Sequence, residues 1–317
     1  MPWAPAAPRK ASAVLWVVLS SMLVAAGCGG ASMSPNSAPV NSGGVPQFDH
    51  VLVVVEENQS YANVIGNPAA PFLNSLALRY GLATSYFADA HPSLPNYFML
   101  TAGAAIAMND AFAGTVTQDN VVRALVNANK SWRCYADSIP SVGYLGPDSG
   151  SYIRHHVPFA YISDVVNEPT QAANLVPASQ LTADLANSAL PNYAFIVPNA
   201  VHDGHNCLNG GTCANNDKIA QIDMWLQSTI QPVLDSPDFQ DSGLLLVTFD
   251  EGDIDDTAHG GGHVTTLVIS SKAKSGFQST TFYQHQSTLA LMLTALRVSD
   301  LPGAAATAPS MAEFFRQ

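Results

Sequence analysis

The chain has 317 residues, of which 47% are hydrophobic and only 11% charged. This composition can supply one large core, and it excludes a disordered chain and a membrane-embedded one. The formal charge of -12 argues against nucleic acid as a partner, because binding its phosphate backbone needs clustered lysine and arginine. No protein partner is indicated.

The first 28 residues have the order of an export signal. Arg9 and Lys10 precede an apolar run over residues 13–27, which is shorter than the roughly 20 residues that span a bilayer. The run ends in Leu-Val-Ala-Ala-Gly-Cys, which resembles a bacterial lipobox and predicts lipidation of Cys28. The alternative is an ordinary secretory signal with an incidental cysteine. We therefore expect an exported protein that is lipid-anchored at the cell envelope, or otherwise periplasmic or secreted.

Cleavage of this signal removes both basic residues and moves the formal charge from -12 to -14. Residues 29–46, rich in Gly, Ser, Pro and Asn, are predicted to form a flexible linker before a single domain of residues 47–317. Cys207 and Cys213 lie six residues apart in a glycine-rich stretch, and an exported protein keeps its disulfides, so these two cysteines are predicted to pair. Cys134 is then left over, and we expect it to be buried.

Buried β-branched runs alternate with segments of helical periodicity along the domain. In chain order, the predicted elements are strand 48–56, helices 73–80 and 120–129, strand 194–197, helix 220–234, strands 243–249 and 264–269, and helix 286–296. The alternation predicts an α/β fold in which helices cover both faces of a largely parallel sheet. Ligands of such sheets bind beyond the carboxyl ends of the strands, so polar residues there become functional candidates.

Two acid-bearing pairs, Glu57-Asn58 and Asp250-Glu251, follow predicted strands. Their oxygens suit a hard or borderline divalent cation. The alternative is that each pair caps a helix or faces solvent.

Ser93 is a candidate nucleophile. Pro95 can occupy the first turn of a helix running toward Ala102, which leaves Ser93 near the helix N-terminus, where free N–H groups favour a phosphate. Coordination to a metal can deprotonate a serine hydroxyl without a histidine base, although an N-cap role is the alternative. Asn96 could hydrogen-bond a phosphate oxygen from the same side of the turn, or could be a structural cap.

In this order the motifs resemble the phosphoesterase family of bacterial acid phosphatases and phospholipases C, in the alkaline-phosphatase superfamily. The resemblance spans residues 48–315 and rests on Glu57–Tyr61, His91–Tyr97, Pro198-Asn199, Asp203–His205, Asp250-Glu251, Gly262–Val264, Tyr283 and His285. It implies an alkaline-phosphatase-like three-layer α/β/α sandwich. It also implies a metal bound by Glu57, Asn58, Asp250 and Glu251, and Ser93 as nucleophile.

Histidines supply further candidates, because imidazole can bind phosphate, ligate metal or donate a proton near neutral pH. We assign catalytic roles to His205 and His263 and substrate binding to His202, with a solvent-facing loop position as the alternative for His202. The segment Tyr152–Phe159 resembles a substrate-side segment of the family, which implies substrate binding by His155. The family implies one metal while superfamily relatives hold two, so Asp203 is a possible additional ligand. The cation could be Zn, Mg, Mn or Ca.

The sequence thus predicts a metal-dependent hydrolase of phosphoric esters, an acid phosphatase that acts on phosphomonoesters through a phosphoseryl intermediate. Larger phospholipases C carry His-Gly-Gly after the acidic pair, whereas residues 252–256 here read Gly-Asp-Ile-Asp-Asp. A phospholipase C-like phosphodiesterase that acts on phospholipid head groups is the alternative. A serine esterase is disfavoured because no Gly-x-Ser-x-Gly elbow occurs. The non-enzyme alternative is a lipid-anchored protein that captures phosphate esters without cleaving them.

Overall fold

The computed structural model describes residues 1–4 and 43–316. The apolar run of the predicted signal, Cys28 and linker residues 29–42 lie outside the described residues. The chain divides into units of residues 1–38 and 39–317, and all that follows concerns the second unit. Val45 is buried in the core of this unit, and its carbonyl accepts a hydrogen bond from Arg297, so ordered packing begins before Gln47.

Within residues 43–316, eight strands form one sheet in the order β4-β3-β5-β1-β6-β7-β2-β8. Their bounds are β1 His50–Glu56, β2 Gly81–Ala83, β3 Trp132–Ala136, β4 Leu175–Pro177, β5 Tyr193–Val197, β6 Gly243–Phe249, β7 Thr266–Ile269 and β8 Gln278–Ser279. Pairing is parallel throughout except at β7, which runs antiparallel to β6 and β2. The sheet is therefore mixed but mostly parallel, as predicted.

The central strands are buried on both faces. Every residue of β5 and β6 is buried, as is every residue of β1 after His50. Burial on both faces is the reason that these strands are continuous apolar runs without polar alternation. All seven residues of β1 pair in register with β6, from His50 opposite Gly243 to Glu56 opposite Phe249. This pairing fixes the relative height of the loops that follow the two strands.

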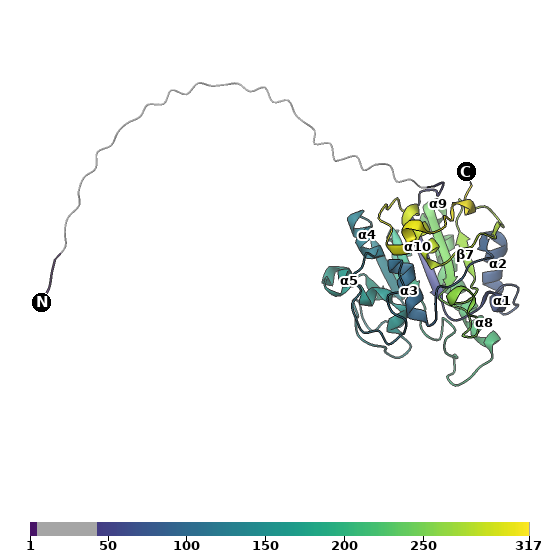
Figure 1. Ribbon diagram of the computed structural model, residues 1–317, viewed down its shortest axis with the longest axis horizontal. Helices are drawn as coiled ribbons and strands as arrows, with labels where there is room; N and C mark the ends of the chain where they lie inside the picture. Colours follow the sequence, from purple (N-terminus) through teal and green to yellow (C-terminus); the bar gives the residue numbers. More distant parts are fainter. Residues whose placement is uncertain (5–42, 317) are drawn as a thin grey trace, which may run out of the picture. The chain divides into compact units, whose positions relative to one another are not determined.

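Two groups of helices flank the sheet (Figure 1). One group is α2 (Pro71–Arg79), α7 (Ser179–Ala186), α8 (Asn215–Asp235) and α9 (Pro237–Ser242), in which α8 packs against the other three. The other group is α3 (Ser93–Ala102), α4 (Val121–Asn127) and α10 (His285–Ala295), which pack on one another. Because α9 and α10 both contact β1, the arrangement is the predicted α/β/α sandwich.

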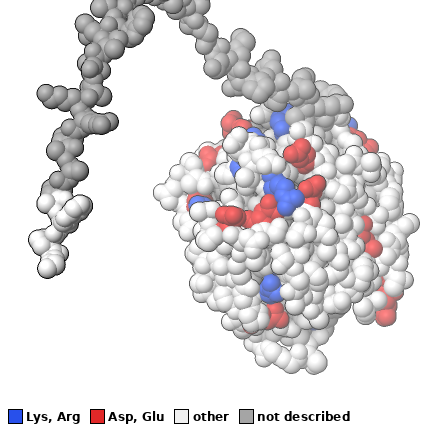
Figure 2. Space-filling view, turned by 60° about the vertical axis from the view of Figure 1, so that its left-hand side comes forward, with Lys and Arg blue, Asp and Glu red and all other residues white. Residues whose placement is uncertain are grey.

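Short helical segments complete the described part of the chain. They are α1 (Tyr61–Val64), α5 (Ser163–Val166), α6 (Pro169–Ala172) and the 3₁₀ helices η1 (Arg154–His156), η2 (Pro158–Tyr161), η3 (Ala258–Gly260), η4 (Gly303–Thr307) and η5 (Ala312–Phe314). Cys207 and Cys213 form the predicted disulfide, and Cys134 is buried without a partner cysteine. None of the described helices is both long and apolar enough to cross a bilayer. Figure 2 shows one face on which most side chains are uncharged.

The topology brings the predicted functional segments to one edge. Strands β5, β1 and β6 are parallel neighbours, so their carboxyl ends meet at the same side of the sheet. Glu57 follows β1 and Asp250 follows β6, and the Asp250 amide donates to the Glu56 carbonyl at 2.9 Å. Helix α3 begins at Ser93, the residue that the position of Pro95 had placed near a helix N-terminus.

We expect the central strands to carry most of the stability. Leu246→Ala removes a fully buried side chain from β6 and should lower the free energy of unfolding by about 2–5 kcal/mol, through lost burial and a residual cavity. Leu78→Ala is the matched control, because this leucine on α2 is 77% exposed and its loss should change stability by less than about 0.5 kcal/mol. Chemical denaturation of both variants tests this, and equal effects would contradict the assignment of the core.

Candidate active site

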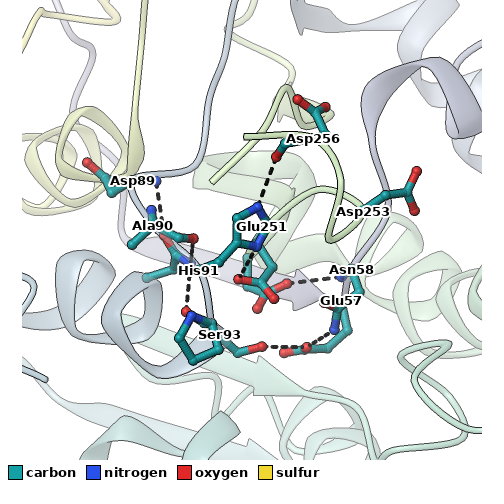
Figure 3. Close-up of polar contacts among 12 residues, drawn as sticks. Glu57, Asn58, Asp89, Ala90, His91, Ser93, Glu251, Asp253 and Asp256 are labelled. Carbon is teal, nitrogen blue, oxygen red and sulfur yellow. Dashed lines mark hydrogen bonds and ion pairs between the residues drawn. The ribbon is translucent and has the colours of Figure 1, made fainter. Parts of the chain in front are cut away.

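Glu57 is the centre of the candidate site (Figure 3). Its carboxylate is fully buried and accepts three side-chain hydrogen bonds. Tyr97 donates to Oε1 at 2.6 Å. Ser93 Oγ at 3.0 Å and the side-chain amide of Asn58 at 2.6 Å donate to Oε2. The predicted nucleophile and two of the predicted metal ligands therefore lie in direct contact.

Ser93 is held by the segment that precedes it. The Asn96 side chain accepts from the Asp89 and Ala90 amides at 3.0 and 3.1 Å, and it donates to the Ala90 carbonyl at 2.8 Å and the Pro92 carbonyl at 3.4 Å. Asn96 is fully buried, so in this conformation its amide fixes the approach to α3. The substrate contact predicted for Asn96 stays a prediction.

The second acidic pair lies beside the first. Asp250 Oδ1 accepts from the backbone amide of Asn58 at 3.1 Å, and Asp250 is fully buried. Glu251 is 3% exposed, and its Oε2 lies 3.0 Å from Nδ1 of His91. In Figure 3 the His91 ring lies between Glu251 and the backbone of Asp256, whose carbonyl is 2.9 Å from Nε2. Both predicted acidic pairs thus contribute to one cluster.

His156 is a site residue that the sequence analysis did not identify. Its ring is 1% exposed, with Nε2 3.2 Å from Glu57 Oε1 and Nδ1 3.2 Å from Asp203 Oδ2. It therefore bridges the Glu57 cluster to Asp203, the possible additional metal ligand, which is itself fully buried. The sequence offered the pair His155-His156, and no periodicity in the surrounding loop indicated which ring would turn inward.

The other predicted histidines lie around this cluster at different depths. His155 is half-buried and packs edge-on against His156, and His205 is exposed, with its ring centroid 6.4 Å from that of His156. His202 pairs with Asp137 at 2.5 Å and stacks on Trp225.

His263 lies apart from the other histidines. Its ring stacks between Tyr61 and Phe87, and its Nε2 is 3.1 Å from the Thr84 carbonyl. Within residues 43–316, no hydrogen bond or ion pair joins its ring to Ser93 or to either acidic pair, so its predicted catalytic role stays a prediction.

The acidic groups destabilise one another as anions. Burial is the main cause that raises the pKa of Glu57, and the charges of Asp250 and Asp203 raise it further. Burial likewise raises the pKa of Asp203 and Asp250, and it raises that of Glu251 with help from Asp250. A divalent cation would supply the compensating charge, because proximity to a cation favours the ionised carboxylate.

The donor set fits a hard cation in its chemistry. Glu57, Asn58, Asp250 and Glu251 offer carboxylate and amide oxygens, and Asp250 Oδ2 is buried with no hydrogen-bond partner. Among the described residues, however, no three His, Cys, Asp or Glu side chains are already arranged around a common metal position.

Comparisons with known proteins agree with the resemblance read from the sequence. Residues 67–298 match the model of the Phosphoesterase family. The chain is 36% identical over 211 residues to phosphatidylinositol-3-phosphatase of Mycobacterium tuberculosis, covering 66% of this chain and 65% of the relative. It is 29% identical over 272 residues to an acid phosphatase of Aspergillus fumigatus, covering 82% and 57%. The chain thus spans less than two thirds of the length of these curated relatives.

Solved structures share the fold at low sequence identity. An alkaline phosphatase superfamily protein from Vibrio parahaemolyticus superposes with a TM-score of 0.57 at 12% identity, over 84% of this chain and 71% of that one. Lipoteichoic acid synthase LtaP from Listeria monocytogenes gives 0.57 at 11%, over 81% and 74%. These likenesses establish the alkaline-phosphatase-like fold that the sequence predicted.

We expect the metal-free protein to lose stability above neutral pH. Burial raises the pKa of Asp250 to about 7 and that of Glu251 to about 9, against about 4 in an unfolded chain. Burial lowers the pKa of His155, His156 and His285. An unfolded histidine titrates at about pH 6.5, so above about pH 7.5 the raised pKa values of the carboxyls dominate and the folded form binds the extra protons. The free energy of unfolding should then fall by about 1.4 kcal/mol per pH unit for each such group until its folded pKa is passed.

Thermal unfolding from about pH 7.5 to about pH 9 with a chelator measures this fall. A saturating divalent cation should flatten the profile, because the ion holds the carboxylates in their ionised form. Equal stability of the chelated protein at both ends of the range would contradict the assignment.

Proposed function

The chain belongs to the phosphoesterase family, and we propose that it is a metal-dependent phosphoric ester hydrolase, an acid phosphatase that cleaves phosphomonoesters through a phosphoseryl intermediate. One observation carries this proposal. Ser93 opens helix α3 with its hydroxyl directed at Glu57, inside a cluster that also holds Asp250 and Glu251. A nucleophile at a helix N-terminus beside a cation-binding set is the arrangement that phosphoryl transfer requires.

When bound by Glu57, Asn58, Asp250 and Glu251, the cation would neutralise phosphoryl oxygens and lower the pKa of the nucleophile. The Ser93 hydroxyl donates to Glu57 Oε2, so this carboxylate is placed to take the proton that Ser93 loses on attack. Ser93 Oγ bonds to phosphorus while the ester P–O bond breaks, and the alcohol leaves with a proton. Water then attacks the phosphoserine and returns a proton to the group that protonated the alcohol, the P–Oγ bond breaks, Ser93 takes its proton back from Glu57, and phosphate departs.

Two histidines are placed to serve these steps. His205 is exposed beside His156, where a departing alcohol would pass. We assign to it the donation of a proton to the oxygen of the leaving alcohol. His156 touches both Glu57 and Asp203 and is buried, so we assign it the positioning of these carboxylates. Burial lowers the pKa of His156 to about 3, which keeps its ring neutral in this role.

We assign the substrate to phosphomonoesters of small molecules or of phospholipid head groups. The M. tuberculosis relative is named for a phosphate monoester carried by such a head group. The face in Figure 2 carries few Lys and Arg side chains, and they lie next to acidic ones, which disfavours nucleic acid. A phospholipase C-like phosphodiesterase is the alternative, and a comparison of monoester and diester substrates distinguishes the two.

We also propose that the protein is exported and held at the cell envelope by a lipid on Cys28. The support is the basic-then-apolar order of residues 9–27 and the Ala-Gly-Cys that ends it. A lipid-anchored phosphatase would meet its substrates outside the cytoplasm, where the Cys207–Cys213 disulfide persists.

The decisive test is turnover by purified residues 43–317. We expect hydrolysis of p-nitrophenyl phosphate that a chelator abolishes and a divalent cation restores. Ser93→Ala should lower kcat by at least about 10³-fold, because the covalent step is lost. Ser228→Ala, on the exposed side of α8, is the matched control and should retain full activity.

The same panel includes p-nitrophenyl phosphorylcholine and a phospholipid. Preference for these diesters would identify a phosphodiesterase instead. Normal turnover by Ser93→Ala would reject the serine mechanism, and binding of phosphate without turnover under any divalent metal would favour the non-catalytic binding protein.

Lipidation is tested in the full-length chain expressed in a bacterial host. We expect the wild-type protein in the membrane fraction and Cys28→Ala in the soluble exported fraction, because the variant lacks the thiol that carries the lipid. Cys134→Ala, which removes a different free cysteine, should fractionate like the wild type. Unchanged partitioning of Cys28→Ala would reject the anchor.

A further inference from the structure

Asp110 occupies the N-terminus of helix α3, beside the nucleophile. The first amides of a helix lack intrahelical acceptors, and Pro95 has no amide hydrogen, so the amides of Ser93 and Leu94 are the donors at the start of α3. The Leu94 amide donates to Asp110 Oδ1 at 2.9 Å. Asp110 reaches this amide from a loop 16 residues further along the chain.

The Asp110 carboxylate also faces the rest of the site. Its negative charge raises the pKa of Glu251, and it acts on the pKa values of His155 and His156 in the same direction. Within residues 43–316, no Lys, Arg or His side chain forms an ion pair with Asp110. An uncompensated anion thus lies next to an acidic cluster, which is an arrangement that electrostatics alone would disfavour.

A carboxylate oxygen and a phosphoryl oxygen are the same kind of hydrogen-bond acceptor. The amide that follows a nucleophile at a helix N-terminus is well placed to hold a phosphoryl oxygen in the transition state. In the free protein this donor is satisfied by Asp110. A phosphoryl group that used it would have to displace the carboxylate and bear its repulsion.

We propose that Asp110 is a specificity-determining residue that takes the place of a phosphoryl oxygen on the Leu94 amide and leaves it when a phosphate ester binds. This inference rests on the proposed phosphatase function. Its consequence is that Asp110 weakens the binding of inorganic phosphate, the product of the proposed reaction. The carboxylate then returns to the amide as the product departs, which favours release and limits product inhibition.

The test compares Asp110→Ala and Asp110→Asn with wild-type residues 43–317 loaded with a divalent cation. Inorganic phosphate is the probe, through calorimetric binding and through inhibition of p-nitrophenyl phosphate hydrolysis. Asp110→Ala frees the amide and removes the charge, so phosphate should bind about tenfold more tightly, the factor typical of a hydrogen bond to a charged group. Asp110→Asn keeps an acceptor without the charge and should give an intermediate gain.

Asp148→Ala is the matched control. Asp148 also accepts from a backbone amide, that of Arg154 at 2.8 Å, and its charge also acts on His155 and His156. In the described part of the chain no hydrogen bond or ion pair joins Asp148 to α3, so its loss should change phosphate affinity less than about twofold. A gain confined to the Asp110 variants would separate occupancy of the Leu94 amide from a general loss of negative charge.

Other outcomes overturn the inference. Unchanged or weaker phosphate binding in both Asp110 variants means that Asp110 caps α3 or supports the metal instead. Should Asp110→Ala fail to fold, the isosteric Asp110→Asn decides alone. Wild-type protein that binds phosphate but hydrolyses no ester rejects the proposed function, and the calorimetric comparison still decides the role of Asp110. Absence of phosphate binding in all forms rejects both.

Discussion

The structure depends on the burial of several carboxylates at one edge of the sheet. Glu57, Asp203 and Asp250 are fully buried and Glu251 nearly so. Taking such groups out of water is costly unless hydrogen bonds or a counter-charge compensate. The side chains of Tyr97, Ser93 and Asn58 donate hydrogen bonds to Glu57. No Lys or Arg of residues 43–316 forms an ion pair with any of the four carboxylates.

The fold tolerates the free-energy cost of these buried carboxylates because the site follows the two central strands. Strands β1 and β6 are paired along their whole length and buried on both faces, so the residues that follow them have little freedom. Helix α3 packs on α10, and the Asn96 side chain fixes the segment before Ser93. Preorganisation of this kind holds like charges together in a geometry that a flexible loop would relax.

Local patterns in the sequence predicted what depends on local order. The run 243–249 corresponds to β6 residue for residue. A short apolar stretch between polar flanks is typical of a strand in a sheet that helices cover on both faces. Strands β2, β3, β4 and β8 were not predicted, since they are short or carry polar residues such as Arg133 within them. Their identity follows from pairing with partners distant in sequence.

The same limit applies to the site. Glu57, Ser93 and Asp250 could be named as candidates because each directly follows or opens an element, a position that the sequence indicates. His156 and Asp110 could not be found, because their roles arise from contacts made across 99 and 16 residues of chain, with Glu57 and Leu94 respectively. The Asn96 side chain shows the converse, since a position that suits substrate contact is occupied here by backbone groups.

The scarcity of fixed positive charge around Ser93 bears on the binding of the ester. Arg154 adjoins His155, yet its guanidinium lies 4.0 Å from the Tyr161 ring centroid and donates to the Ala160 carbonyl. Burial lowers the pKa of His155 to about 4, so at neutral pH its ring adds no charge. These side chains therefore offer a phosphate dianion little positive charge in the metal-free protein. In the proposed mechanism a bound cation would supply that charge, and cation binding and ester binding would then favour each other.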